Sequence, residues 1–306
     1  MKPFVLPTAP IGPAMLEPLN LCLYGPPGIG KTPICATLPS AIYLDLQRGT
    51  LTYTCMRVDV MSEAEERGLA YWEMFEEAAK LARSARPKFI IIDTIGDLAD
   101  WADAKALSRF KNSPMGKDFD QPSVLDLPGV KGSAGFGKLW DAFQELLAAC
   151  MGSWHRTIFV GHPKDKIAYA VGTDPNVKQD TFASAEDLDL TGKMRRIFTS
   201  KMAAIGYMNR AWEGNRVNAT FTSRDAFSKT RCPHLDGRTL PFSNPCTLAE
   251  WARIYPNTLG EYLLPADRAA LAGLLAKYGG AATAPAPAAA VPAPIPTAAV
   301  TMAPTA

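Results

Sequence analysis

The chain has 306 residues, of which 47% are hydrophobic, and its 32 Lys and Arg nearly cancel its 30 Asp and Glu. This length and composition are enough for one α/β domain with a well-buried core, plus appendages. The near balance of charge argues against a protein that coats nucleic acid or acts on acidic substrates through its overall charge, so any electrostatic partner site must be local.

Cysteine usage and hydropathy indicate the cellular compartment. The six cysteines are scattered and form no C-x-x-C pair, which favours a reduced compartment. Cys232, His234 and Cys246 lack a fourth ligand with suitable spacing, so we expect no zinc site. Residues 1–15 carry four prolines, and no segment approaches the roughly twenty apolar residues that a membrane helix requires. We therefore expect a cytoplasmic protein without a membrane partner.

Four short apolar or β-branched runs predict buried strands. They are Asn20 to Tyr24, Ala41 to Asp45, Phe89 to Asp93, and Thr157 to Gly161. Near-continuous apolar runs are typical of a parallel sheet that is covered on both faces.

Helical patterns lie between these strands. One helix is predicted to begin at Ser62, because Ser62 and Glu65 match a capping box ahead of an apolar series. That series is Leu69, Trp72, Phe75 and Leu81. A second helix is predicted from about Lys138 to Cys150. Strands that alternate with helices indicate βαβ units and a doubly wound, mostly parallel α/β sheet.

The second half of the chain changes pattern. Met202 to Asn209 and Arg216 to Ser223 predict antiparallel strands, joined by a turn at residues 213–215, that extend the sheet's edge. Thr247 and Glu250 form a capping box for a helix, and a last helix is predicted from after Pro265 to residues 279–280.

Composition and pattern divide the chain into four predicted parts. Residues 281–306 carry no charge and are almost entirely Ala, Pro, Thr and Val, so they cannot bury a core and are expected to be disordered. The expected division is an N-terminal extension (1–18), an α/β core (19–245), C-terminal helices (246–280) and this tail.

Residues 25–32 match G-x-x-x-x-G-K-[ST] directly after an apolar run, which is the strand context that a phosphate-binding loop requires. The residues expected to bind nucleotide are Gly25, Pro26, Pro27, Gly28, Ile29, Gly30, Lys31 and Thr32. Backbone N–H groups are expected to hold the β-phosphate, Lys31 to reach the β- and γ-phosphates, and the Thr32 hydroxyl to ligate magnesium. The predicted cofactors are ATP and Mg²⁺.

The run Phe89 to Asp93 matches the second nucleotide-binding strand, with Asp93 as the carboxylate that holds the magnesium ion's water shell beside Thr32. The Gly-Pro-Pro-Gly start of the loop resembles AAA+ ATPases, which usually place a glutamate after this aspartate as catalytic base. Thr94 stands there instead, as hydroxyl residues do in RecA-like ATPases.

The order of five motifs resembles the phage-encoded RecA-like P-loop ATPases, some of which act in single-strand annealing recombination. The motifs begin at Tyr24, Tyr43, Ile90, Ile158 and Ser228, and the resemblance covers roughly residues 19–242. It implies a RecA-like fold, ATP hydrolysis, single-stranded DNA as a partner, a homo-oligomer that is a filament or a ring, phage recombination proteins as further partners, and a host cell's cytoplasm as the location.

The resemblance also assigns roles to individual residues. Residues 45–47 align with the family's Asp-x-Glu, whose glutamate polarises the attacking water, but Gln47 can only orient water, so slow hydrolysis is expected. His162 matches a polar sensor of the γ-phosphate, although a locally bonded histidine is an equal alternative. Lys229 and Arg231 match cations that reach a neighbouring subunit's nucleotide, with solvated loop charges as the alternative.

Two long segments, 109–137 and 163–190, are predicted to be loops at the carboxyl edge of the sheet, where a partner binds. The first offers basic and aromatic residues for single-stranded DNA: Arg109, Lys111, Lys117, Lys131, Phe110, Phe119 and Phe136. Ten basic against three acidic residues between Lys193 and Arg238 are expected to follow a phosphate backbone, or to mate with the acidic stretch 63–77 of another subunit.

These patterns lead to one expected function and two rivals. The expected function is a magnesium-dependent ATPase that binds single-stranded DNA and assists phage recombination. The first rival is a nucleotide-gated scaffold with weak hydrolysis that recruits replication or packaging proteins, which Gln47 favours somewhat. The second is a motor such as a helicase or terminase subunit, which the short chain and the lack of a nuclease carboxylate cluster disfavour.

Overall fold

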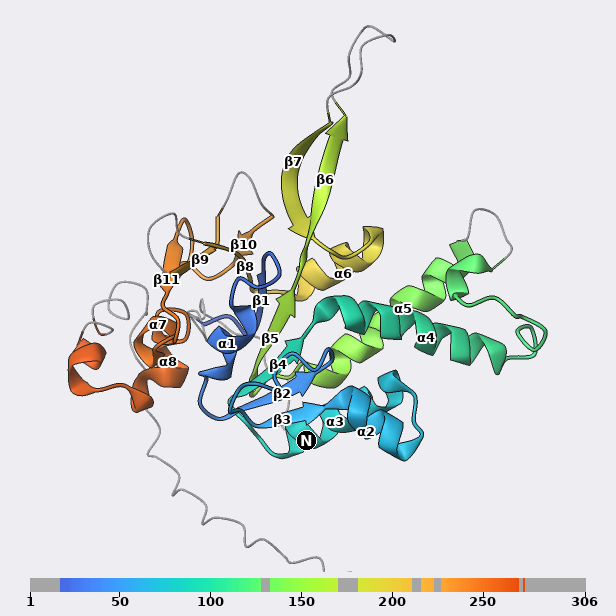
Figure 1. The fold of residues 1–306 in the computed structure, drawn as a ribbon, viewed down its shortest axis with the longest axis horizontal. Helices are drawn as coiled ribbons and strands as arrows, with labels where there is room; N and C mark the ends of the chain where they lie inside the picture. The colour runs from blue at the N-terminus through green and yellow to red at the C-terminus, as the bar shows by residue number, and fades with distance from the viewer. Residues whose placement is uncertain are drawn as a thin grey trace, which may run out of the picture.

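A computed structural model describes residues 17–127, 133–169, 181–210, 216–222, 227–269 and 272. Within them, a nine-stranded sheet has the order β11-β9-β8-β1-β5-β4-β2-β3, with β10 also paired to β8 (Figure 1). The strands are β1 (Asn20–Tyr24), β2 (Ala41–Asp45), β3 (Arg57–Asp59), β4 (Phe89–Asp93), β5 (Arg156–Gly161), β8 (Ala204–Arg210), β9 (Val217–Thr220), β10 (Lys229–Thr230) and β11 (Thr239–Phe242).

The sheet is parallel from β3 to β8 and antiparallel beyond β8. The four buried strands predicted from apolar runs are confirmed, as is the antiparallel pair that extends the edge. Side chains alternate between the faces, so that Cys22 and Tyr24 pack into one core cluster while Leu21 and Leu23 pack into the other.

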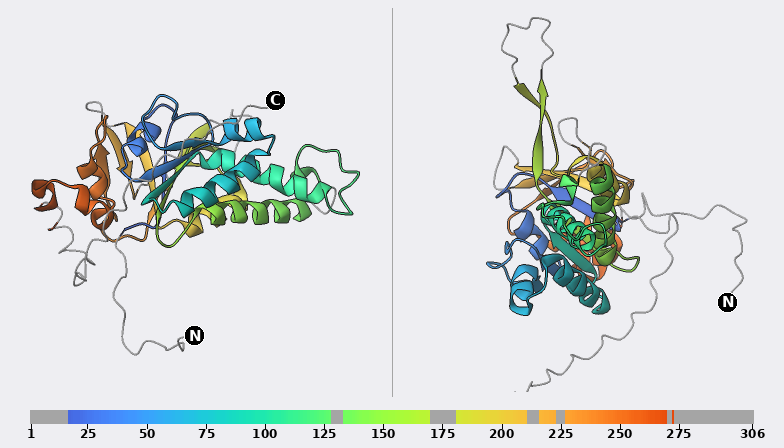
Figure 2. Two further views of the ribbon diagram at one scale, coloured as in Figure 1. Left: turned by 90° about the horizontal axis from the view of Figure 1, so that it is seen from below. Right: turned by 90° about the vertical axis from the view of Figure 1, so that its right-hand side faces the viewer.

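Helices cover both faces, as a doubly wound sheet requires (Figures 1 and 2). One face carries α3 (Tyr71–Ser84), α4 (Ile95–Lys111), α5 (Ser133–Cys150) and α6 (Gly192–Lys201). The other carries α1 (Lys31–Ala36), α7 (Leu248–Ala252) and α8 (Pro256–Leu259). Short 3₁₀ turns occur at η1 (Val124–Asp126) and η3 (Gly260–Tyr262). The predicted α/β class with a mostly parallel, doubly wound sheet is confirmed.

The helix predicted to begin at Ser62 is two helices, so that prediction was wrong. Helix α2 (Val60–Arg67) begins earlier because the Asp59 carboxylate caps it, accepting a hydrogen bond from the Ser62 backbone N–H at 2.9 Å. Gly68 then adopts φ 65° and ends α2 before α3 begins at Tyr71. The Ser62–Glu65 capping box therefore does not form.

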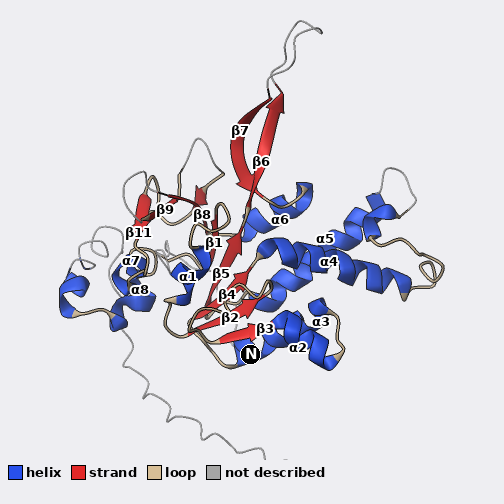
Figure 3. Cartoon of the chain, in the orientation of Figure 1, coloured by secondary structure: helices blue, strands red, loops and turns tan. Residues whose placement is uncertain are grey.

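The two segments predicted as long loops contain regular structure. Residues 109–137 include the end of α4, the turn η1 and the start of α5. Residues 163–190 include β6 (Pro163–Tyr169) and β7 (Thr181–Leu188), an antiparallel hairpin that projects from the end of β5 (Figure 3). Its strands lack the continuous apolar run by which a buried strand is recognised, and sequence analysis therefore missed them.

The C-terminal helices pack into the same core as the nucleotide-binding motif. The predicted capping box of Thr247 and Glu250 forms at the start of α7 and is confirmed. From α7, the Trp251 Nε1 donates to the backbone oxygen of Ile34 at 3.1 Å and to the Thr37 hydroxyl at 3.2 Å. Trp251 thus supports the end of α1, the helix that follows the phosphate-binding loop.

Several sequence predictions fall outside the described residues. These are the structure of residues 1–15, the turn at 213–215, the end of the last helix at 279–280 and the tail 281–306; of the last helix, residues 265–269 are helical. Among the described helices, none is both long enough and apolar enough to span a bilayer.

Candidate nucleotide-binding site

The predicted site residues converge at the carboxyl edge of the parallel sheet. Register places Tyr24 beside Gly161, and Asp45 beside Asp93. Residues 25–32 begin at this edge, and His162 follows Gly161 there. Since strands β1, β2, β4 and β5 all point the same way, residues far apart in sequence, such as Asp45 and Asp93, meet at one surface.

Two glycines make the shape of the phosphate-binding loop (residues 25–32) possible. At Gly25 an added Cβ would lie 2.3 Å from the Met208 backbone oxygen on β8, so no larger residue fits. Gly30 has φ 104°, a backbone conformation that L side chains rarely adopt. A pocket of about 400 Å³ lies against this loop; it is lined by Pro26, Pro27, Gly28, Ile29, Asn209 and Arg210.

The Lys31 side chain is buried beneath the loop. Its Nζ donates to the backbone oxygens of Gly25 at 2.7 Å and of Pro26 at 2.9 Å. Burial lowers the pKa of Lys31 to about 8, although the nearby Asp93 carboxylate favours its charged form. Lys31 is therefore a cation with little solvation of its own, held where an anion on the loop would meet it.

Thr32 and Asp93, the two predicted magnesium ligands, are in direct contact. The Thr32 hydroxyl donates to Asp93 Oδ2 at 2.7 Å. Burial raises the pKa of Asp93 to about 6, while the bond from Thr32 opposes that rise. A hydroxyl and a carboxylate are hard oxygen donors of the kind that Mg²⁺ takes in nucleotide sites, so the residues present fit that ion.

His162 lies at the same edge, directly after β5. Its Nδ1 is 3.5 Å from Lys31 Nζ. Burial lowers the pKa of His162, and the positive charge of Lys31 lowers it further, so the imidazole is neutral near pH 7. The structure thus brings the predicted sensor within reach of the lysine that is expected to contact the γ-phosphate.

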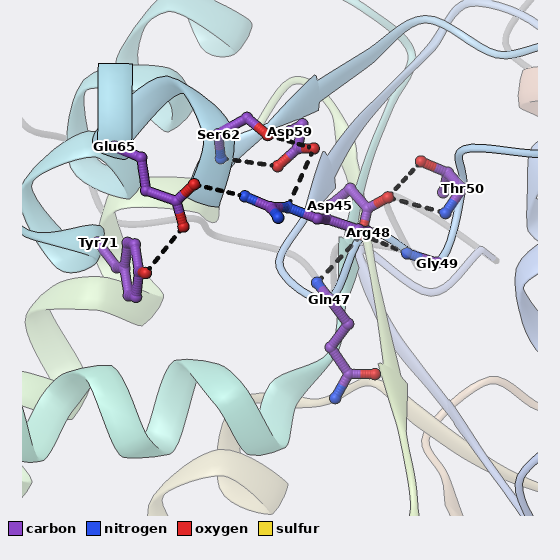
Figure 4. Close-up of polar contacts among 9 residues, drawn as sticks. All are labelled: Asp45, Gln47, Arg48, Gly49, Thr50, Asp59, Ser62, Glu65 and Tyr71. Carbon is purple, nitrogen blue, oxygen red and sulfur yellow. Dashed lines mark hydrogen bonds and ion pairs between the residues drawn. The ribbon is translucent and has the colours of Figure 1, made fainter. Parts of the chain in front are cut away.

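The segment from Asp45 to Thr50, here called the Gln47 loop, is organised by the buried carboxylate of Asp45 (Figure 4). Asp45 Oδ1 accepts from the backbone N–H groups of Gln47 and Gly49, both at 3.1 Å. Asp45 Oδ2 accepts from the Thr50 N–H at 2.8 Å and from the Thr50 hydroxyl. Both carboxylate oxygens are committed to the loop, so Asp45 positions Gln47 instead of facing a water molecule as a base.

The side chain of Gln47 reaches the residue that follows Asp93. Gln47 Nε2 donates to the Thr94 hydroxyl oxygen at 3.3 Å, and that hydroxyl donates to Asp97 Oδ2 at 2.5 Å. Sequence reasoning treated Thr94 only as a mark of relationship, and it missed this chain of contacts. Its signal was the spacing of Thr94 and Asp97, which places them on one side of the first turn of α4.

Arg48 ties the Gln47 loop to the neighbouring helices (Figure 4). Its φ is 59°, and its guanidinium contacts Glu65 Oε2 at 2.8 Å and Asp59 Oδ2 at 3.5 Å. Glu65 also accepts from the Tyr71 hydroxyl at 3.1 Å. This connection was not predicted, because Glu65 had been assigned to a capping box.

Lys229 and Arg231 have partners within their own chain. Lys229 Nζ donates to the Thr199 oxygen at 2.6 Å, and an Arg231 nitrogen donates to the Ser200 oxygen at 3.2 Å. Both carbonyls belong to the last turn of α6, where cations are favourable. A role for Lys229 and Arg231 across a subunit interface stays a prediction.

Several aromatic and charged residues expected to bind DNA contact other side chains of the same chain. Phe110 and Phe119 pack edge to face at 5.3 Å, and Phe136 stacks on Trp140 at 5.8 Å, so the expectation of free stacking rings was wrong for the first pair. Further ion pairs and ring contacts join Arg109 to Glu145, Arg195 to Asp187 and Lys193 to Trp140. Lys111 and Lys117 are exposed and form no ion pair among the described residues.

Most acidic residues of the stretch 63–77 have partners within the chain. Glu63 and Glu77 both pair with Arg67, Glu65 pairs with Arg48, and Glu73 accepts from the backbone N–H of Ala70. Because these acids already have partners, the contacts argue against binding of this stretch to the basic segment of another subunit.

Comparison with known proteins places these motifs in a family. A family model described as an AAA domain matches residues 17–232, which is more than half of the chain. No curated protein matches the sequence. Similar solved structures include the flagellar accessory protein FlaH from Methanocaldococcus jannaschii (12% identity, TM-score 0.33, covering 73% of this chain and 84% of that chain). Another is the RadB recombinase (12% identity, TM-score 0.30, covering 74% and 88%). Since the matched residues contain the phosphate-binding loop, Asp93 and His162, the chain belongs to the AAA domain family.

Proposed function

We propose that this protein binds ATP together with Mg²⁺ and hydrolyses ATP slowly to ADP and phosphate. The observation that carries the proposal is the convergence of Lys31, Thr32 and Asp93 at one end of β1 and β4, with the Thr32 hydroxyl 2.7 Å from Asp93. When bound, the metal ion neutralises charge on the phosphate oxygens. Thr32 and Asp93 would hold it, and Lys31 would leave the loop carbonyls for the β- and γ-phosphates.

Gln47 is the proposed residue that orients the attacking water. Its amide cannot take a proton, and a positioned general base typically contributes about 10²- to 10⁴-fold, so turnover is expected to be slow. Thr94 and Asp97 would fix the orientation of that amide through the contacts described above. His162 would report the γ-phosphate to the β6–β7 hairpin, which begins at the next residue.

The nucleotide proposal is tested by titrating MgATP into the wild type, Lys31→Ala and a matched control, Lys111→Ala. Lys111 is an exposed lysine at the end of α4. We expect Lys31→Ala to lose binding and turnover while its circular dichroism is unchanged, and Lys111→Ala to behave as the wild type. Equal affinities of all three proteins would overturn the site assignment.

We further propose single-stranded DNA as the partner and phage recombination as the setting. The support is the motif order that resembles phage-encoded RecA-like ATPases, together with a local basic excess of seven charges between Lys193 and Arg238 (ten basic minus three acidic). On single strands the logarithm of affinity should fall against the logarithm of salt with a slope of about −0.7 per phosphate contact. An absent or salt-insensitive interaction would remove this partner.

A homo-oligomer with nucleotide at the subunit interface is part of the same proposal. Lys229 and Arg231 would have to leave the end of α6 to reach a neighbour's nucleotide. Arg231→Ala mixed with Lys31→Ala should then regain turnover, because each mutant supplies what the other lacks. Inactive mixtures in which the two mutants demonstrably co-assemble would argue for the helix-capping role alone.

The alternative function is a nucleotide-gated scaffold with weak hydrolysis that recruits replication or packaging proteins. The observation that favours it is Gln47 itself, which stands where relatives carry a base. Turnover at saturating MgATP, measured with and without single-stranded DNA, separates the two: stimulation by DNA supports the recombination role, whereas tight nucleotide binding without stimulation supports the scaffold.

A further inference from the structure

The surface opposite the phosphate-binding loop carries an aromatic ring among basic side chains. A pocket of about 640 Å³ lies between the end of α3 and the turn before β5. We call it the Trp154 pocket, and its lining is Glu76, Lys80, Arg83, Ser84, Arg86, Ala149 and Trp154. Since β4 begins at Phe89 and β5 at Arg156, the pocket lies at the amino edge of the sheet. It is therefore separate from the nucleotide site.

Trp154 is exposed but firmly supported. The side chain is 44% exposed, and its ring meets the His155 ring at 4.5 Å and 69°. His155 is fully buried, bonds the Cys150 carbonyl oxygen at 2.8 Å and packs so closely on Gly152 that an added Cβ there would lie 2.3 Å from the imidazole. A large apolar ring is thus presented to solvent from a rigid base.

The charge around this ring is positive. Lys80 and Arg86 are exposed, and Arg83 is held by bonds from its guanidinium to the backbone oxygens of Ala148 (3.5 Å) and Ala149 (3.3 Å). The one carboxylate in the lining, Glu76, is paired with the buried Lys105. Its charge is therefore compensated from inside the protein. Lys80 and Arg86 face solvent without an acidic partner in the lining, and Arg83 lies between them at the end of α5.

A second, smaller pocket on the other side of Trp154 shows the contrast. Its volume is about 240 Å³, and it includes Lys88 and Arg156. Here each cation has its own acid, because Lys88 pairs with Glu261 and Arg156 with Glu17. The uncompensated charge consequently lies on the α3 side of Trp154 alone.

We propose that the Trp154 pocket binds single-stranded nucleic acid, with a base stacked on Trp154 and phosphates held by Lys80, Arg83 and Arg86. An open aromatic face among spaced cations fits this ligand, because every base has a π-face and every nucleotide a negative charge. An acidic peptide would satisfy the cations but not the ring. The inference rests on the proposed DNA partner, and it places the contact away from the carboxyl edge, where Phe110, Phe119 and Arg195 are engaged internally.

Two variants test the pocket by fluorescence anisotropy of a labelled oligothymidylate at several salt concentrations. Trp154→Ala should weaken binding at least fivefold, since stacking of one base contributes about 1–3 kcal/mol, and Trp154→Phe should restore most of it. Lys80→Ala combined with Arg86→Ala should reduce the salt slope by about 1.4, which is two contacts at about 0.7 each. Arg67→Ala combined with Arg253→Ala, an equal loss of exposed charge elsewhere, should leave the slope unchanged.

Each result has a defined meaning. If the wild type binds the oligonucleotide and the pocket variants bind equally well, the inference is overturned while the DNA proposal stands. If the wild type binds MgATP but no oligonucleotide, the DNA partner fails and the inference with it. Competition by polyglutamate as strong as by unlabelled oligothymidylate would assign the pocket to an acidic protein partner instead.

Discussion

The phosphate-binding loop and the Gln47 loop lie at the same edge of the sheet, after strands β1 and β2, yet they are held in different ways. The first takes its shape from its own residues: Gly25 and Gly30 allow the turn, and Lys31 bonds the carbonyls of Gly25 and Pro26. The second takes its shape from the buried Asp45 carboxylate and from Arg48, which reaches α2.

We therefore expect substitutions in the phosphate-binding loop to affect ATP binding, and substitutions around Asp45 to affect the position of Gln47. Loss of the Lys31 side chain removes two hydrogen bonds to carbonyl oxygens but leaves the glycine turn in place. Because burial lowers the pKa of Lys31, its charged form is not stabilised by folding. A loop shaped by one buried carboxylate does not tolerate loss of that group, because several N–H donors then lose their partner at once. The following substitutions test this difference, and the one with the largest expected effect comes first.

Asp45→Ala should have the largest effect, on both stability and turnover. It removes the acceptor for the N–H groups of Gln47, Gly49 and Thr50, and we expect a loss of about 2–4 kcal/mol in the free energy of unfolding. Thermal denaturation monitored by circular dichroism measures this. Lys31→Ala is the control: it should melt with the wild type while losing MgATP binding. A reversed pattern, with Lys31→Ala the less stable protein, would contradict the comparison.

Gln47→Glu should raise turnover by up to about 10²-fold with little change in MgATP affinity, because it restores a base at a position that the Asp45 contacts already fix. Steady-state hydrolysis at saturating MgATP measures the change. The Asp97 carboxylate is linked to this position through Thr94, and two acids there would repel each other. A fall in turnover would therefore mean that Asp97 already supplies the carboxylate, and Asp97→Asn should then be inactive.

Affinity for MgATP should depend on pH through Asp93 and Lys31. The folded-state pKa of Asp93 is raised to about 6, so below pH 6 the carboxylate is protonated and affinity should fall up to about tenfold per unit. Lys31 has a pKa lowered to about 8, so affinity should also fall above pH 8 as the free protein loses that charge. Titrations from pH 5 to 9 measure both flanks. Asp93→Asn should not show the fall in MgATP affinity below pH 6. If the fall is unchanged in Asp93→Asn, it must come from the titration of another group.

Arg48→Ala should have the smallest effect, a two- to threefold lower kcat with an unchanged KM, since exposed ion pairs contribute about 0.2–1 kcal/mol. The side chain is 39% exposed and connects the Gln47 loop to Glu65. Arg67→Ala is a matched control, because Arg67 is 46% exposed and pairs with Glu63 without touching the loop. Arg48→Lys, which keeps a positive charge beside Glu65 and Asp59, should retain most of kcat. Equal effects of Arg48→Ala and Arg67→Ala would show that the connection does not position Gln47.

The buried parallel strands β1, β2 and β4 and the phosphate-binding loop could be predicted from local sequence. The strands β1, β2 and β4 begin and end at the predicted residues, because a buried parallel strand must be apolar over its whole length. Residues 25–32 could be identified just as directly, since glycine, lysine and threonine at those spacings are typical of a phosphate-binding loop. The capping box at Thr247 was likewise local, and the structure contains it.

Which polar side chains are free depends on contacts that form only when the chain folds. Asp59 outcompeted Ser62 as a helix cap, and Lys229 and Arg231 found carbonyls on α6 thirty or so residues away. Folding also decides which aromatic rings are exposed. Phe110 packs against Phe119, whereas Trp154 remains exposed and packs on the buried His155. Sequence shows that a charge or a ring exists, but its availability depends on neighbours brought close by folding, and no local pattern records those neighbours.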